Sequence, residues 1–193
     1  MISPAKLQAS ISEQAARTLV DAYLTAALGA AYTTSDSRGV HDADGWIFLI
    51  KHQNIPTPVG RITVAEKTSQ VIALTGDELR DVCECVAYEQ AREQGQIARD
   101  SQGYVLRYHA WRTARAYASE QIAFYARTER PVIIEDTRPV WRATAFLQLQ
   151  GRGRVCDLGA IDVDAHTGEV LPWGWRQRSH MRKRAQNAAR RSA

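Results

Sequence analysis

Apolar residues in the first half of the chain recur first with helical spacing and then as a continuous run. The stretch Ile11–Ala27 carries apolar residues every three or four positions, which predicts an amphipathic helix that ends near Gly29. Ser10 and Glu13 form a capping-box pattern at its start. The run Trp46–Ile50 then predicts a buried strand.

Further patterns complete the first half. Residues Thr33–Gly45 are polar and rich in Ser, Asp and Gly, which predicts a loop. The alternation over Arg61–Ala65 predicts a half-buried strand, and Val71–Leu74 predicts another short one. Thr75–Glu78 is a second capping-box pattern, and the helical spacing over Asp77–Gly95 predicts the helix that it starts.

The second half shows a similar order of patterns. A helical stripe runs over Trp111–Tyr125, and the β-branched run Val132–Ile134 follows it. Trp141–Gln150 and Val155–Val163 predict a hairpin, because the glycines between them permit positive φ. The Thr-Gly turn in Ala165–Gly168 leads to a short returning apolar run.

The two halves align on their strands. Trp46 and Trp141 lie 95 positions apart, and Ile62 and Ile161 lie 99 positions apart. These offsets predict an α+β protein made of two related helix-plus-antiparallel-sheet halves. Chance similarity between two small α+β hairpins is the alternative explanation.

The polar stretch Asp100–Gly103 marks the expected boundary between the halves. We expect one α+β module over residues 1–99, a second over 100–175 and a basic C-terminal tail over 176–193. The composition, 45% hydrophobic and 24% charged, is that of an ordinary globular protein. No apolar run approaches the length of a membrane span.

Charge is distributed unevenly around the net value of +4. Residues 174–193 hold seven of the 25 Lys and Arg residues and none of the 21 acids, which leaves 18 cations and a net charge of −3 elsewhere. Such a tail favours an acidic partner: nucleic acid, an anionic membrane surface or an acidic protein face. A solubilising tail, or one that folds back on its own body, is an equally good explanation.

The predicted partner-binding residues are the tail cations and two tryptophans beside them. Trp173 and Trp175 lie at alternate positions and are suited to stack on bases or to insert at an interface; a lid over the end of the second sheet is the alternative. Trp46 and Trp141 are instead expected to anchor the core. The predicted site comprises Trp173, Trp175, Arg176, Arg178, Arg182, Lys183, Arg184, Arg190 and Arg191.

The reactive side chains form no recognisable catalytic or metal-binding pattern in the sequence. The five histidines lack paired metal spacing, and no nucleophile elbow or phosphate loop occurs. Cys83 and Cys85 should point to different faces of a helix, since they lie two positions apart. Asp162, Asp164 and His166 alternate as in a calcium loop, but a polar hairpin turn explains them better. We therefore expect no metal and no cofactor.

Two family resemblances rest on these segments. The segment Ala160–Leu171 resembles the closing signature of PepSY-type domains. The first half resembles the immunity-protein and YrhB-like family, on Gly45–Phe48, Pro58, Ile62–Val64, Thr68–Val71 and Leu74–Leu79. Both resemblances imply small modules in which a helix packs on an antiparallel sheet, with roles in binding, inhibiting or neutralising a partner protein.

Three functional hypotheses follow. The first is a non-enzymatic, cytoplasmic protein-interaction module, either immunity- or inhibitor-like or a subunit of an assembly; its location rests on the absence of a secretory signal. The second is a nucleic-acid-associated protein that uses the tail, so that deleting residues 176–193 abolishes binding. The third is a small enzyme with an unrecognised site, for which the best candidates are His109, His166, Asp162 and Asp164.

Overall fold

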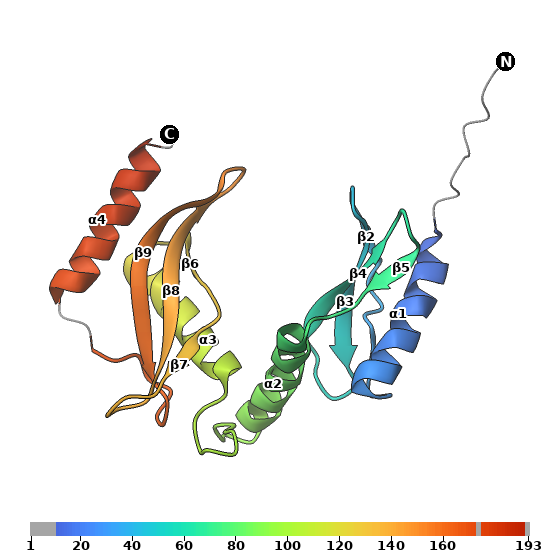
Figure 1. Ribbon diagram of the computed structural model, residues 1–193, viewed down its shortest axis with the longest axis horizontal. Coiled ribbons are helices and arrows are strands. Elements are labelled where there is room, and N and C mark those ends of the chain that lie inside the picture. The colour runs from blue at the N-terminus through green and yellow to red at the C-terminus, as the bar shows by residue number, and fades with distance from the viewer. Residues whose placement is uncertain (1–10, 173–174, 192–193) are drawn as a thin grey trace. The chain divides into compact units, whose positions relative to one another are not determined.

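The computed structural model describes residues 11–172 and 175–191 and confirms an α+β fold with two antiparallel sheets (Figure 1). The chain divides into two compact units, Met1–Gln90 and Ala91–Ala193. The observed division therefore falls nine residues before the predicted end of the first module at residue 99.

Unit 1 is a sheet with strand order β1-β3-β4-β5, in which β2 also pairs with β3. β1 pairs with the second half of β3 and β2 with the first half, so both lie on the edge opposite β4. The elements are α1 (Glu13–Leu28), β1 (Tyr32–Thr34), β2 (Val40–His41), β3 (Gly45–His52), β4 (Gly60–Ala65), β5 (Gln70–Ile72) and α2 (Gly76–Glu93).

The helix starts in unit 1 agree in part with the capping patterns. Ala15 N donates to Ser12 Oγ at 3.3 Å, so Ser12 caps α1; Ser10 lies outside the described residues. Thr75 and Glu78 form the predicted capping box, because Thr75 N donates to Glu78 Oε2 at 2.8 Å and Glu78 N donates to Thr75 Oγ1. The loop prediction over Thr33–Gly45 is wrong where β2 pairs with the edge of β3.

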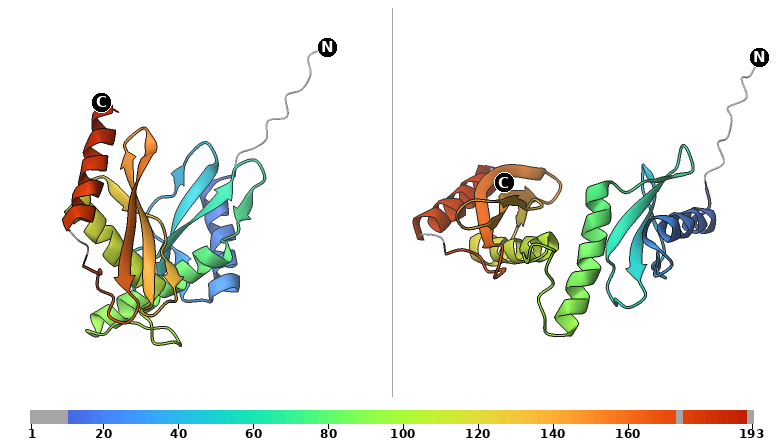
Figure 2. Two further views of the ribbon diagram at one scale, coloured as in Figure 1. Left: turned by 60° about the vertical axis from the view of Figure 1, so that its left-hand side comes forward. Right: turned by 60° about the horizontal axis from the view of Figure 1, so that its bottom comes forward.

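Unit 2 has β8 at its centre, with β6 and β7 pairing along one edge and β9 along the other. Its sheet curves over α3 (Figure 2). The elements are α3 (Arg107–Tyr117), the π-helical turn η1 (Ala118–Ile122), β6 (Ala126–Thr128), β7 (Val132–Ile134), β8 (Val140–Leu149), β9 (Gly153–Asp164) and α4 (Trp175–Arg191).

The two units share one chain path and one register. Trp46 is paired with Val64, and Trp141 is paired with Val163. Val71 of β5 pairs with Val64 as Val170 pairs with Val163. Residues that pair in the sheet of unit 1 therefore correspond to residues that pair in unit 2, at the offsets of 95 and 99 positions found in the sequence.

Both tryptophans tie a strand to the start of a helix. Trp46 Nε1 donates to the Ile11 carbonyl at 2.9 Å, and Trp141 Nε1 donates to the Val105 carbonyl at 3.0 Å. Each acceptor lies two residues before the first residue of α1 or α3. Each indole thus fixes one helix across its sheet while its ring covers the core edge.

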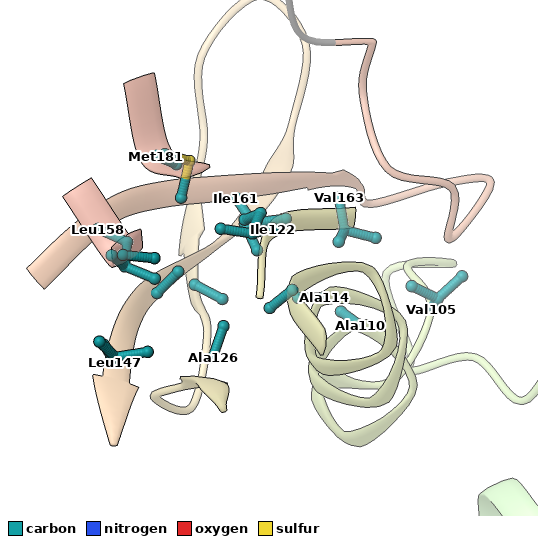
Figure 3. Packing of buried hydrophobic residues seen from close by; sticks show 14 residues of the cluster. Val105, Ala110, Ala114, Ile122, Ala126, Leu147, Leu158, Ile161, Val163 and Met181 are labelled. Carbon is teal, nitrogen blue, oxygen red and sulfur yellow. The ribbon is translucent and has the colours of Figure 1, made fainter. Parts of the chain in front are cut away.

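The helices bury equivalent positions, 94 residues apart. α1 turns Ala16, Val20 and Leu24 inward, and α3 with η1 turns Ala110, Ala114 and Ala118 inward. In unit 2 these small residues pack with Leu147, Leu158, Ile161 and Val163 of the sheet (Figure 3). Alanines at these three positions let the helix approach the sheet closely.

The basic tail predicted over residues 176–193 is not a separate tail over its described part. Residues Trp175–Arg191 form α4, which lies along β9 (Figures 1 and 2). Met181 and Ala185 are only 2% and 3% exposed and belong to the core of unit 2 (Figure 3). The sequence contains the signal for this face, an apolar residue at 181, 185 and 188, but the cations Arg182–Arg184 interrupt it.

We expect Trp141→Phe to lower the free energy of unfolding by about 2 kcal/mol, because it leaves the buried Val105 carbonyl without its donor. Trp46→Phe should cost less, since Ile11 is only half-buried. Urea denaturation measures both losses. The control is Ile72→Ala at an exposed strand position, and a Trp141→Phe loss no larger than the control would contradict the role of the indole.

Candidate functional site

The strongest candidate site in the described residues is helix α4, which β9 positions. Gly159 of β9 has φ +147°, and a Cβ at this position would lie 3.5 Å from Met181 Cε. This is an ordinary van der Waals distance, so the positive φ and not a lack of space favours glycine at this position. In unit 1 a Cβ on Gly60 would lie only 2.9 Å from Val82 Cγ2 of α2, so there the glycine does make room for the helix.

The cations of α4 point away from this buried line. Successive residues are turned by about 100° in a helix, so Lys183 and Arg190 lie opposite Met181. Arg178 and Arg182 lie on one flank. Every described cation of α4 except the half-buried Arg178 is exposed, namely Arg182, Lys183, Arg184, Arg190 and Arg191.

The α4 cations Arg182 and Arg184 meet backbone carbonyls rather than carboxylates. Arg182 Nε donates to the Gln121 carbonyl at 2.7 Å, and Arg184 Nη1 lies 3.5 Å from the Leu158 carbonyl. Among the side chains that the structure describes, no ion pair joins residues 177–191 to a carboxylate. The helix therefore presents an uncompensated positive surface.

Arginines of the unit 2 sheet contrast with those of α4. Arg142 holds Asp162 through two hydrogen bonds of 2.8 Å, and Arg154 contacts both Glu129 and Asp157. These ion pairs raise the pKa of Arg142, through its hydrogen bond to Asp162, and lower the pKa of Glu129, through its hydrogen bond from Arg154. The charges of Arg142 and Arg154 are thus balanced by nearby carboxylates, unlike those of the described α4 cations.

Positive charge in the N-terminal and middle parts of α4 does not stabilise the helix, whereas the helix dipole favours Arg190 and Arg191 in its last turn. Arg178 and Arg182 are like charges four residues apart, which repel each other on a helix surface. Arg176 and Arg178 lie in its N-terminal part, where the helix dipole disfavours cations. An uncompensated charge of this kind is typical of a surface that meets an anionic partner.

Two adjoining hollows follow the flank of α4 that faces β9. One has a volume of about 500 Å³ and is lined by Gly159, His180 and Arg184, among others. The other, of about 350 Å³, is lined by Asp157, Arg184 and Arg191, among others. Arg184 borders both hollows, so anionic groups entering either of them meet its guanidinium group.

The predicted partner-binding residues are brought together only in part. Trp173 lies outside the described residues, and Trp175 and Arg176 form the first turn of α4. The remaining members share one helix but not one face of it. Deleting residues 176–193 would remove Met181 and Ala185 from the core, so the deletion proposed from the sequence would test folding before binding.

The four candidate catalytic residues have structural contacts. Asp162 pairs with Arg142, and His166 lies in a turn with its ring 5.1 Å from that of Tyr104. His109 packs against the Gly168 turn, and burial lowers its pKa. Over the described ranges, no three His, Cys, Asp or Glu side chains are placed to hold a metal ion.

Asp164 closes the turn after β9. Its carboxylate accepts hydrogen bonds from the backbone N–H groups of His166 and Thr167 at 2.8 and 2.7 Å and pairs with Arg138 at 2.6 Å. Burial alone would raise the pKa of this carboxyl group, but the Thr167, Arg138 and His166 donors outweigh it and lower the pKa to about 2. The predicted polar turn is therefore organised by one buried acid.

Among residues 11–172 and 175–191, none of the helices combines the length and the apolar character that a bilayer crossing requires.

Sequence reasoning missed two exposed aromatic residues in unit 2, Phe124 and Tyr125. The helical stripe in the sequence predicted that Tyr125 is buried in the core. Because η1 ends at Ile122, both Phe124 and Tyr125 follow the helix and their rings lie outside the core.

Asp164→Asn should lower the free energy of unfolding by about 2 kcal/mol at neutral pH. The folded pKa of about 2 lies below the ordinary value of 3.8, so the carboxylate adds stability above pH ~4 that is lost as the pH falls toward 2. Urea titrations across this range should show the two proteins converging at low pH. Asp157→Asn, which breaks an exposed ion pair, is the control and should cost well under 1 kcal/mol; equal losses would contradict the role of Asp164.

Comparison with known proteins gives no family for this chain: no family model, no curated protein and no solved structure matches it. The PepSY-type and immunity-protein resemblances therefore stay predictions.

Proposed function

We propose that this chain is a non-enzymatic binding protein that holds nucleic acid through helix α4. The observation that carries the proposal is a helix with seven cations and no acid, docked on a sheet without a carboxylate partner in its described part. Docking fixes the helix before binding, so no folding entropy is spent when a ligand arrives.

Phosphate backbones suit this surface. Cations that neutralise phosphates release condensed counterions, which supplies a large favourable entropy at low salt. The guanidinium group also matches phosphate geometry, because it donates two parallel hydrogen bonds. Six of the seven α4 cations are arginines, which supports phosphate recognition over simple solubility.

The remaining parts of the chain serve as a scaffold in this proposal. The four candidate catalytic side chains hold turns and ion pairs, which supports binding rather than chemistry. A cytoplasmic site of action belongs to the same proposal, since nucleic acid is accessible there.

Replacing Lys183 and Arg190 by Gln should weaken nucleic-acid binding without disturbing the fold, because both side chains are exposed and opposite the buried line. We expect the slope of log K against log salt to fall by about 1.5 and the affinity at 0.1 M salt to fall roughly 10–30-fold. Fluorescence anisotropy with a labelled oligonucleotide measures both quantities.

The matched control is Lys67→Gln with Arg152→Gln, which removes two exposed cations from turns outside α4. The control should leave the salt slope nearly unchanged. Equal effects of the two double variants would show that only net charge matters and would contradict a site on α4.

A second candidate function, binding of a protein partner, is favoured by two exposed valines. Val40 of β2 and Val132 of β7 are 63% and 60% exposed. They occupy equivalent edge positions. In each unit the valine comes one residue before the edge-strand residue that pairs with the tryptophan of the central strand. Exposed apolar residues on sheet edges are typical of strand-to-strand docking.

Affinity purification in high salt with nuclease distinguishes this second function. A partner bound at the edges should survive 1 M salt and be lost in the Val40→Lys, Val132→Lys double variant, because Lys blocks edge pairing. The Lys183→Gln, Arg190→Gln protein serves as control and should retain the partner. Loss of all bound protein in high salt would contradict the edge-binding function.

A further inference from the structure

Unit 2 exposes two adjacent aromatic side chains at the end of η1. Phe124 is 77% exposed and Tyr125 is 48% exposed, and their rings meet edge-to-face at 5.1 Å. The flanking residues Ile122 and Ala126 are buried, so the backbone is held in the core while both rings project outward. Rings in this position add little to folding, because their apolar area stays in water.

Two guanidinium groups contact backbone carbonyls at or near this aromatic pair. Arg127 Nη1 donates to the carbonyls of Phe124 and Ala126 at 3.2 and 2.9 Å. Arg182 of α4 donates from Nε to the Gln121 carbonyl, three residues before Phe124. A guanidinium group has five N–H donors, so each arginine is oriented by the backbone and still has donors for a ligand.

The α4 charge extends from this corner along one flank of the helix. Arg178 lies one turn before Arg182 on the same flank, and neither pairs with a carboxylate in the described residues. Exposed aromatic rings interleaved with backbone-oriented cations are the composition of single-strand binding surfaces, on which bases stack while cations hold phosphates.

We infer that the corner formed by Phe124, Tyr125, Arg127 and Arg182 binds single-stranded nucleic acid, with bases stacked on the two rings and phosphates on the arginines. The inference rests on the proposed function and specifies its ligand. A duplex keeps the faces of its bases stacked inside the helix, so it can meet the cations but not the rings. Single strands should therefore bind more tightly than duplexes with the same number of phosphates.

The test uses the full chain with a labelled oligodeoxythymidylate and, separately, a labelled duplex of equal phosphate number. Phe124→Ala should weaken single-strand binding by on the order of tenfold and leave duplex binding unchanged, because it removes stacking alone. Phe124→Trp should retain tight binding. Ile97→Ala, at another exposed apolar position of the same unit, is the control and should change neither affinity.

Salt dependence separates the two kinds of contact. Phe124→Ala should leave the slope of log K against log salt unchanged, whereas Arg182→Gln should lower it by about 0.7 for the single strand. Circular dichroism melting of each variant confirms an intact fold, which is expected for so exposed a ring.

The outcomes distinguish this inference from the function on which it rests. If the wild-type chain binds both probes and Phe124→Ala changes neither affinity, the inference is overturned and binding through α4 stands. Equal weakening of single strand and duplex by Phe124→Ala also overturns it. If the wild-type chain binds neither probe at low salt, the proposed function itself fails.

Discussion

The contact between Met181 and Gly159 decides what the C-terminal part of this chain is. Without it, residues 175–191 would be a cationic segment with too little apolar area to order itself. With it, the helix gains a buried line through Met181 and Ala185 and adds its residues to the core of unit 2. The charged side chains then lie on the faces of the helix that do not contact the sheet. The basic residues therefore form a surface with a fixed position on unit 2.

The same architecture supports different surfaces in the two units. α2 and α4 occupy equivalent places, each over a glycine of the strand after the central hairpin turn. α2 contains six acids and two arginines, whereas α4 contains seven cations and no acid. Because only two to four residues of each helix are buried, the outer residues are free to diverge in charge without loss of the fold. The two units therefore differ in the charge of this helix while they share the framework that holds it.

Several elements were predictable because their signals are local. The capping box at Thr75 and Glu78 and the strand led by Trp46 depend on residues close in sequence. The offsets between Trp46 and Trp141 and between Ile62 and Ile161 were readable as well, and both reproduce the strand register. The short strand β2 was missed, since two residues of edge pairing leave no periodic pattern. The exposure of Tyr125 was also missed, because the helical stripe continues past the residue where η1 ends.

By itself, the sequence determined the α+β class, the repeated order of helix and strands and the concentration of cations near the C-terminus. Only the tertiary structure decided that those cations belong to a docked helix and that Arg142 and Arg154 of the sheet pair with carboxylates. It also decided that Arg182 contacts the Gln121 carbonyl, three residues before Phe124. These features depend on contacts between residues far apart in the chain, such as Met181 with Gly159 and Arg182 with Gln121. A one-dimensional pattern records which side chains can be buried or charged, but the partner that each one meets is fixed by the packing of the whole unit.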